Sequence, residues 1–522
     1  MHSAGARRAA AVPEARSAKR VRRAVPALAG AAAAAVIGLS SGHARANGRF
    51  PAANQILFWP GDPHLVVART TYGILVSRDD GASWTYLCEE ALGLPSSATQ
   101  DPELAFSAGG ALVAGLDSPI AGLDVSTDVG CDWRCVGGPL AGLPIADLTF
   151  RAGAPGALIA LASSYLPADA GAGTLTQLYE SADDGATWAQ LGVPIDPTVV
   201  VQTVDVAPAS PGTMYVSGTR GYGAARTASL FVSADQGAHW TERPIAPFDA
   251  ATEASVFIGA VDPVDSARVY VRTSAALPAG RSRLLVTLDA GQSFQVVQAF
   301  DVADEGGLAT AGEILGFALS PDGSRIYTGT KEGGLFAADR SDLAFAQKAS
   351  IHVQCLATRG SELWACSDVL SGFIVGSSND DGATFTAKLP TVTALAGPVA
   401  CASDAGARAS IACGATANAA QCGPSFEAFC QADDPNGRCA PAAGAPGGED
   451  AGAAADGGQG ARPASSGAAC GCRVARGTSW SGCAGCAVVV GAATARRARA
   501  KRRRGSSVRT LALLGHADQG QG

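Results

Sequence analysis

The chain of 522 residues has few of the groups on which enzyme active sites are most often built. It contains only six histidines, which are scattered along the sequence. It also lacks a glycine-rich phosphate loop, a His-x-x-x-His metal motif and a nucleophile elbow. Imidazole catalysis and nucleotide chemistry therefore have few candidate residues, and we expect neither a metal nor a cofactor.

Basic residues are scarce in the body of the chain. Of the 39 Lys and Arg residues, 18 lie in residues 1–46 and 470–522, where only two of the 46 acids are found. Residues 47–469 therefore hold 21 basic and 44 acidic residues, a formal net charge of −23. A body this acidic is not expected to bind nucleic acid or an anionic membrane surface, whereas cationic ligands are better tolerated.

Cysteine is absent before position 88, yet the rest of the chain has 14 cysteines, many of them near the C-terminus. This usage indicates an oxidising compartment and an exported protein. Cys355 and Cys366 flank Gly360-Ser361, so a two-residue hairpin would place them opposite one another as a disulfide. The alternative is a pair of buried free thiols.

An eight-residue pattern recurs along the chain and is clearest as SADDGATW at residues 181–188. Its central aspartates are Asp79, Asp128, Asp183, Asp235, Asp289 and Asp380, and a worn copy lies near Asp339. Their separations of 41 to 55 residues, with apolar β-rich runs on either side, predict an array of hairpin-containing units, as in a β-propeller.

The chemistry of the pattern suits the turn of a hairpin. Ser and Asp side chains accept bonds from unpaired backbone N–H groups, Gly supplies a positive φ, and Trp or Phe enters the next strand as a buried anchor. Through these Ser-x-Asp-x-Gly-x-Thr-Trp residues the chain resembles the Asp-box (BNR) repeats of sialidases, sortilin-type ectodomains and photosystem assembly-factor propellers. We expect the aspartates to be structural, since a catalytic group would not be needed seven times.

Residues 55–393 divide into seven units of roughly 48 residues, which suits four short strands per blade. The fold class predicted is therefore an all-β, seven-bladed β-propeller spanning residues 47–395. In the first unit the expected strands are residues 55–59, 64–69, 73–77 and 84–88. Turns containing proline, such as residues 60–63, 208–211 and 320–323, should join the first two strands of each blade.

Three long links between second and third strands, residues 163–177, 218–228 and 273–283, predict a binding surface on the face opposite the Asp boxes. The candidate ligand face comprises Tyr165, Arg220, Tyr222, Arg226, Arg272, Arg281 and Arg283. The alternative is a set of solvated loop charges. The sialidase resemblance would require three arginines clamping a carboxylate, a Tyr-Glu pair and a separate acid, and the expected Arg-Ile-Pro-like motif has only a poor match in residues 49–51.

The two ends of the chain resemble targeting segments. Residues 1–46 have a basic lead, an apolar core and an Ala-Arg-Ala cleavage site, as a signal peptide does, with an uncleaved anchor as the alternative. The export route is open between the general pathway and a twin-arginine pathway. Residues 396–440 form a short segment with five cysteines, an odd number, so one must pair elsewhere or stay free. Residues 441–469 read as a disordered linker.

Residues 470–504 follow the order Cys-Gly-Cys, short apolar span and arginine cluster, and residues 505–522 extend beyond them. This order resembles the sorting tails of myxobacterial surface proteins, which implies Cys470 or Cys472 as the processing site. A basic disordered tail, or a zinc site from Cys470, Cys472, Cys483 and Cys486, is the alternative.

These features together favour a non-catalytic module at the cell surface or outer membrane, or secreted, that binds a protein or glycan. We expect a monomer whose membrane contact is confined to the C-terminal tail. The alternatives are a sialidase-like glycoside hydrolase and an assembly factor for a membrane complex.

Overall fold

The computed structural model describes residues 51–94, 101–117, 120–154, 156–165, 173–303 and 312–401, with residues 411–412, 415–416, 422 and 426. The chain divides into two compact units, residues 1–462 and 463–522, and all described residues belong to the first. The predicted signal peptide, linker, processing cysteines and sorting tail lie outside the described residues.

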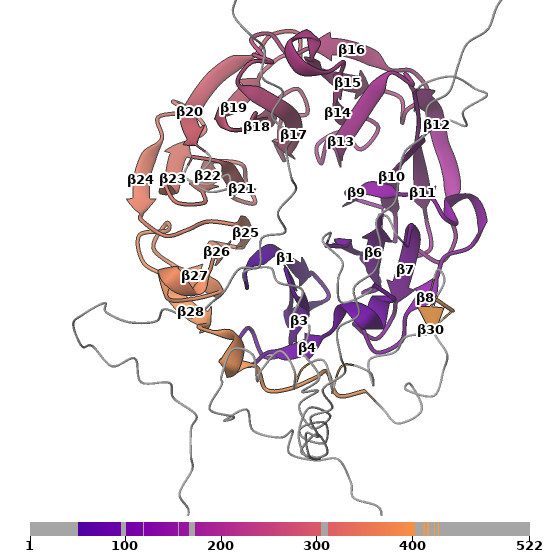
Figure 1. Cartoon of the computed structure of the whole chain (residues 1–522), viewed down its shortest axis with the longest axis vertical. Coiled ribbons are helices and arrows are strands. Elements are labelled where there is room, and N and C mark those ends of the chain that lie inside the picture. The colour runs from indigo at the N-terminus through magenta and orange to yellow at the C-terminus, as the bar shows by residue number, and fades with distance from the viewer. Residues whose placement is uncertain are drawn as a thin grey trace, which may run out of the picture. The chain divides into compact units, whose positions relative to one another are not determined.

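Seven four-stranded antiparallel sheets surround a central channel, as Figure 1 shows. The predicted seven-bladed all-β propeller is confirmed. Blades 1 to 4 are β1 (Ala53–Trp59), β2 (Asp62–Thr70), β3 (Gly73–Ser77) and β4 (Thr85–Leu87); β5 (Glu103–Phe106), β6 (Leu112–Leu116), β7 (Gly122–Ser126) and β8 (Arg134–Cys135); β9 (Ile145–Phe150), β10 (Leu158–Tyr165), β11 (Thr174–Ser181) and β12 (Ala189–Ile195); and β13 (Val199–Val206), β14 (Met214–Arg220), β15 (Thr227–Ser233) and β16 (Thr241–Pro244).

Blades 5 to 7 are β17 (Glu253–Val261), β18 (Val269–Ala275), β19 (Ala279–Thr287) and β20 (Gln295–Ala303); β21 (Ile314–Leu319), β22 (Arg325–Thr330), β23 (Gly334–Asp339) and β24 (Ala346–Ala349); and β25 (Cys355–Arg359), β26 (Glu362–Cys366), β27 (Val375–Ser378) and β28 (Thr386–Leu389). A small extra pair, β29 (Ile411–Ala412) and β30 (Ala415–Thr416), follows the last blade. In each blade the first strand lies innermost and the fourth outermost (Figure 1).

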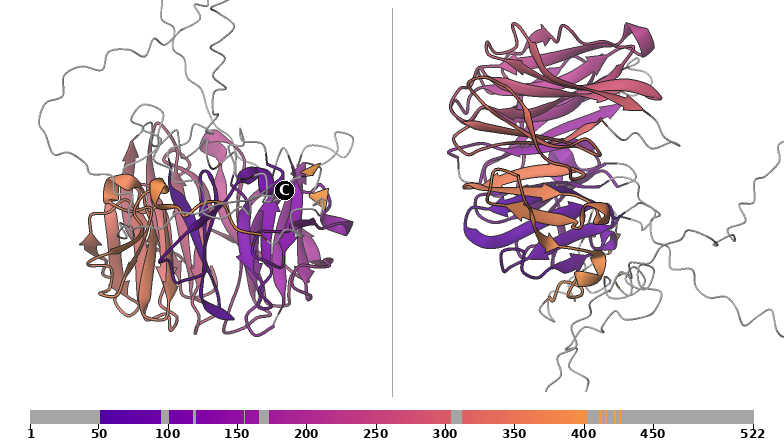
Figure 2. Two further views of the ribbon diagram at one scale, coloured as in Figure 1. Left: turned by 90° about the horizontal axis from the view of Figure 1, so that it is seen from below. Right: turned by 90° about the vertical axis from the view of Figure 1, so that its left-hand side faces the viewer.

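The second strand of each blade is buried along most of its length because both faces of each sheet pack against a neighbouring blade. In β2, for example, Val66, Val67 and Ala68 are successive residues with no exposed surface. Such a run would be unexpected in a sheet with one solvated face, where apolar and polar residues alternate. The core therefore lies between the blades, and Figure 2 shows the sheets stacked around the ring.

The Asp-box turns join the third and fourth strands of the blades. In the blade 3 turn, Ser181 Oγ donates to Asp183 at 2.8 Å and accepts from Gly185 N at 2.9 Å, while Thr187 N and Oγ1 donate to the two oxygens of Asp183. Both the residue after the aspartate and the glycine have positive φ, 58° at Asp184 and 82° at Gly185. The worn copy differs: Asp339 pairs instead with Arg325, and the positive φ is at Leu343.

The ring closes where blade 7 meets blade 1, through side-chain contacts and through backbone bonds between residues 396–399 and residues 84–86. Arg359 of β25 lies over the rings of Phe58 and Trp364 at 4.9 and 5.0 Å, and its guanidinium pairs with Asp80 of blade 1. Lys388 adds a bond from Nζ to the Asp80 carbonyl at 3.0 Å. The planar guanidinium group can stack on the aromatic rings and form an ion pair at the same time, so Arg359 links the two blades firmly.

A covalent clasp strengthens this junction. After blade 7 the chain crosses the outer strand of blade 1, where Val399 N donates to Tyr86 O at 2.9 Å, and two disulfides then fix it: Cys131–Cys401 to blade 2 and Cys88–Cys422 to blade 1. We call residues 395–401 and Cys422, with these two disulfides, the clasp. Two of the five cysteines that the sequence assigned to a small separate segment therefore pair with the propeller. The predicted Cys355–Cys366 disulfide is present, and the two residues are directly opposite in the β25–β26 hairpin.

Candidate functional site

The hairpin turns define two faces of the propeller. In blades 1, 3 and 4 the Asp-box turn donates a backbone N–H to the turn between the first and second strands, from Asp80 to His64 O, Asp184 to Gly156 O and Gln236 to Gly212 O. These turns therefore share one face, the Asp-box face. The turns between second and third strands lie at the opposite ends of the same strands, on what we call the long-loop face.

Two of the three long links are extended hairpins rather than loops. Strands β10 and β11 pair as far as Tyr165 and Thr174, and β14 and β15 pair as far as Arg220 and Thr227. The sequence suggested loops of 11 to 15 residues at 163–177, 218–228 and 273–283, but strand pairing occupies much of the first two. Hairpin pairing satisfies backbone groups that an open loop would leave to water, which favours the extension.

Two of the predicted ligand residues, Tyr165 and Tyr222, project from neighbouring hairpins with relative exposures of 89% and 85%. The hairpins are joined at their ends, since Thr174, opposite Tyr165, donates to Pro197 O and Val199 O of blade 4. Val200, which follows, is 45% exposed. We call Tyr165, Val200 and Tyr222 the tyrosine edge.

The predicted arginines are all held by groups of the protein itself. Arg220 forms ion pairs with Asp196 at 3.0 Å and Glu242 at 2.6 Å, and its guanidinium lies 5.9 Å from the ring centre of Phe231. Arg272 lies 4.5 Å from the ring centre of Phe257 and donates to a backbone carbonyl of blade 6. Burial lowers the pKa of Arg272 below its usual value.

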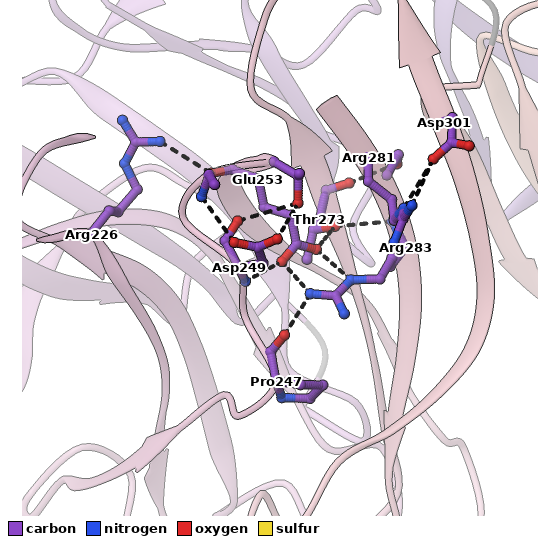
Figure 3. A network of polar contacts seen from close by, with 11 residues as sticks. Arg226, Pro247, Asp249, Glu253, Thr273, Arg281, Arg283 and Asp301 are labelled. Carbon is purple, nitrogen blue, oxygen red and sulfur yellow. Dashed lines mark hydrogen bonds and ion pairs between the residues drawn. The ribbon is translucent and has the colours of Figure 1, made fainter. Parts of the chain in front are cut away.

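Each of the other three arginines has a partner in blade 5 (Figure 3). Glu253 has no exposed surface and receives bonds from Arg283 Nε at 2.7 Å, Thr273 Oγ1 at 2.6 Å and Asp249 N at 2.6 Å. Arg226 donates to the Glu253 carbonyl at 3.2 Å, and Arg281 pairs with Asp301 at 3.0 Å. Breaking such a buried pair would leave an uncompensated charge, so this network holds the hairpin ends together.

Consequently the described arginines do not form an open carboxylate clamp of the sialidase kind. Arg283 pairs with Glu253, Arg281 pairs with Asp301, and Arg226 donates to a backbone carbonyl, so the three guanidinium groups bind separate acceptors of blade 5. Tyr165 and Tyr222 lie on the neighbouring hairpins of blades 3 and 4.

The mouth of the channel on the long-loop face is acidic. A cavity of about 370 Å³ is lined there by Asp101, Glu103, Asp117 and Arg69, with Val201 and Gln202 from β13, the strand that carries the tyrosine-edge residue Val200. Arg69 pairs with Glu103 at 2.9 Å, and Asp101 accepts from Asn54 at 2.6 Å. Three carboxylates and one guanidinium therefore line this mouth.

Further down the channel, side chains of one innermost strand bond to the next. Asp147 accepts from Val204 N at 2.8 Å, and Asp205 accepts from Val261 N at 3.2 Å. Burial raises the pKa of Asp147 well above its usual value, with a further contribution from the Glu103 charge, and burial raises the pKa of Asp205 to about 6. These aspartates satisfy edge-strand N–H groups that would otherwise face the channel unpaired. Sequence reasoning missed them, although an acid within an apolar first strand is the signal.

The Asp-box aspartates have the opposite electrostatics. Bonds from the hydroxyl and backbone of Thr384, with Ser378, lower the pKa of Asp380 to about 2, and equivalent groups lower that of Asp289 to about 2. A carboxylate that must stay ionised to accept these bonds is a poor general acid. Within the described part of the chain, no cluster of three or more His, Cys, Asp or Glu residues could hold a metal, and no helix is long and apolar enough to cross a membrane.

The sequence matches no family model and no curated protein. Among solved structures, a GH74 xyloglucanase from Xanthomonas campestris aligns at 16% identity over 66% of this chain and 64% of its own length, with a TM-score of 0.30. An alpha-L-arabinanase from Penicillium chrysogenum aligns at 16% identity over 51% of this chain and 87% of its own, with a TM-score of 0.35. A protein of unknown function from Dyadobacter fermentans aligns at 16% identity over 55% of this chain and 91% of its own, with a TM-score of 0.35. The chain thus spans about 64% of the xyloglucanase, and the likeness is one of β-propeller fold alone.

Proposed function

We propose that this protein is an exported, non-catalytic binding module that recognises another protein through its long-loop face. The observation that carries the proposal is the tyrosine edge, where Tyr165 and Tyr222 stand almost fully exposed on adjacent, joined hairpins. Exposed aromatic rings are costly to keep in water and are enriched at the centres of protein interfaces. Beside them, Arg220 is fixed by two acids and can serve as a preorganised polar rim.

The acidic mouth defines the chemistry of the partner. Because Asp101, Glu103 and Asp117 outnumber Arg69, a basic side chain is the group that this cavity accommodates best. The partner therefore presents a surface with a Lys or Arg side chain next to a pocket or flat patch for two tyrosine rings. Binding should weaken as salt is raised, since the charges are near the surface. Disulfides such as Cys88–Cys422, Cys131–Cys401 and Cys355–Cys366 are typical of an extracellular setting for this encounter.

The test is binding of the fluorescently labelled full chain to intact cells of its source. The double variant Tyr165→Ser/Tyr222→Ser should bind at least about a hundredfold more weakly, because a truncated aromatic hot spot costs about 2 kcal/mol or more. Leu288→Ser, which removes a 51% exposed apolar side chain from an Asp-box turn, is the matched control and should bind normally.

Pretreatment of the cells distinguishes the partner class. Mild protease treatment should abolish binding, and periodate oxidation of glycans should leave it intact. Normal binding by the double tyrosine variant would overturn the proposed face. Loss of binding after periodate, but not after protease, would overturn the protein partner in favour of a glycan.

A further inference from the structure

A second cavity, of about 490 Å³, lies at the other end of the propeller, on the Asp-box face of blades 1 to 3. Its walls are the innermost strands β1, β5 and β9 and the turns that follow them, and its apolar lining is supplied by Leu57, Phe58, Leu104, Phe106, Leu148 and Phe150. Volume and lining are those of a pocket for a small organic molecule.

The local sequence explains why a space exists here. Strand β5 has four residues, fewer than β1 or β9, and the turns around the cavity carry small side chains at Ala108, Ala152 and Ala154. The mouth is open beside Phe150, whose ring is 61% exposed. The turn after β9 is held rigidly, because Arg151 pairs with Glu180 at 2.6 Å and also donates to Pro211 O.

Two residues that line the cavity have a buried polar atom without a hydrogen-bond partner among the described residues, namely Gln55 Oε1 and Arg151 Nη2. Gln55 Nε2 donates to Leu104 O at 3.0 Å, which orients the amide and leaves Oε1 as its acceptor. Gln55 lines the cavity. A buried acceptor without a donor is costly, so a molecule that supplies one regains that free energy on binding.

We propose that this cavity is a binding site for a small aromatic molecule that carries a hydroxyl donor, of the phenol class. The ring lies among the apolar side chains, and the hydroxyl donates to Gln55 Oε1. The site is independent of the tyrosine edge, which lies on the opposite face.

Phenol and benzene are the matched probes, because they have nearly the same shape and differ in the hydroxyl. A wholly apolar cavity prefers benzene, since the phenol hydroxyl would lose its water without compensation. Isothermal titration of the full chain should give one saturable phenol site, tighter than benzene by about fivefold or more. Preference for benzene, or no saturable binding of phenol, would overturn the proposal.

Three variants locate the site. Gln55→Met, which removes the acceptor, should reverse the preference to benzene while benzene still binds, which shows that the cavity remains formed. Leu57→Trp should fill the cavity and weaken both ligands about tenfold or more. Leu288→Ser, on the same face outside the cavity, should change neither. Phenol binding that is unaffected by Leu57→Trp would place the ligand elsewhere and refute the site.

Discussion

Removal of the clasp disulfides should strongly destabilise the propeller, because they restrain very long loops in the unfolded chain. Cys88–Cys422 spans 334 residues and Cys131–Cys401 spans 270. When one of these disulfides is already formed, it brings the two chain segments together, and the second disulfide closes a much smaller loop. That loop has about 64 residues and consists of segments 88–131 and 401–422. Chain-entropy arithmetic gives about 4 kcal/mol for that circuit and about 6 kcal/mol for the last remaining bridge.

Cys135 of blade 2 is also disulfide-bonded, so the comparison is made in a Cys135→Ala background. There the variants Cys88→Ala/Cys422→Ala and Cys131→Ala/Cys401→Ala should each lower the free energy of unfolding by about 4 kcal/mol, and their combination by about 10 kcal/mol. The loss should exceed the sum of the two pairs, because each bridge shortens the loop that the other closes. Denaturant unfolding followed by tryptophan fluorescence measures this directly. The pair Cys355→Ala/Cys366→Ala, which closes 11 residues, is the control and should cost about 3 kcal/mol.

A quadruple variant that loses no more than this control would refute the reasoning. It would mean that the ring is closed by side chains such as Arg359 alone, and that the clasp adds nothing to the restraint.

Three other perturbations follow from the same structure. Asp183→Ala should cost about 1–2 kcal/mol of unfolding free energy because three hydrogen bonds end on that carboxylate, whereas Asp339→Ala, in the worn copy, should cost less than about 1 kcal/mol. Equal losses in denaturant unfolding would contradict the structural role of the box. The pKa of Asp205 is raised to about 6 in the folded protein, so folding takes up a proton. The free energy of unfolding should therefore fall by up to about 3 kcal/mol as pH rises from about 4 to 6. In urea unfolding at a series of pH values, Asp205→Asn should flatten that slope, and an unchanged slope would assign it to another group. Arg359→Lys should lower the Tm nearly as much as Arg359→Ala, since the ammonium group of lysine cannot both stack on the rings and form a forked ion pair. A Tm of the lysine variant equal to that of the unaltered protein would contradict that account.

Much of the fold could be predicted from the sequence because the information is local and repeated. The box around Asp183 specifies a turn, its recurrence counts the blades, and the strands expected at residues 55–59 and 73–77 lie within 53–59 and at 73–77. The Cys355–Cys366 bridge was accessible for the same reason, since a hairpin with Gly360-Ser361 at its turn sets the register.

The clasp and the sites depend on packing across long sequence distances. The local sequence does not indicate that Cys88 pairs with Cys422, since the five cysteines in the C-terminal segment allow many pairings. The one clue is that Cys131 lies inside an Asp box. The candidate arginines could be named from the sequence, yet the acids that pair with them, such as Glu253, come from other strands. The apolar cavity escaped notice because it arises from the shortness of β5, a property of the assembled ring.

The most direct test of the central claim is photo-crosslinking on the surface of intact cells, with p-benzoylphenylalanine in place of Tyr222 or, as control, Leu288. If the long-loop face binds a protein partner, irradiation should give a discrete protein adduct from position 222 and none from position 288. Adducts from position 288 alone, or equal adducts from both, would contradict recognition through the tyrosine edge.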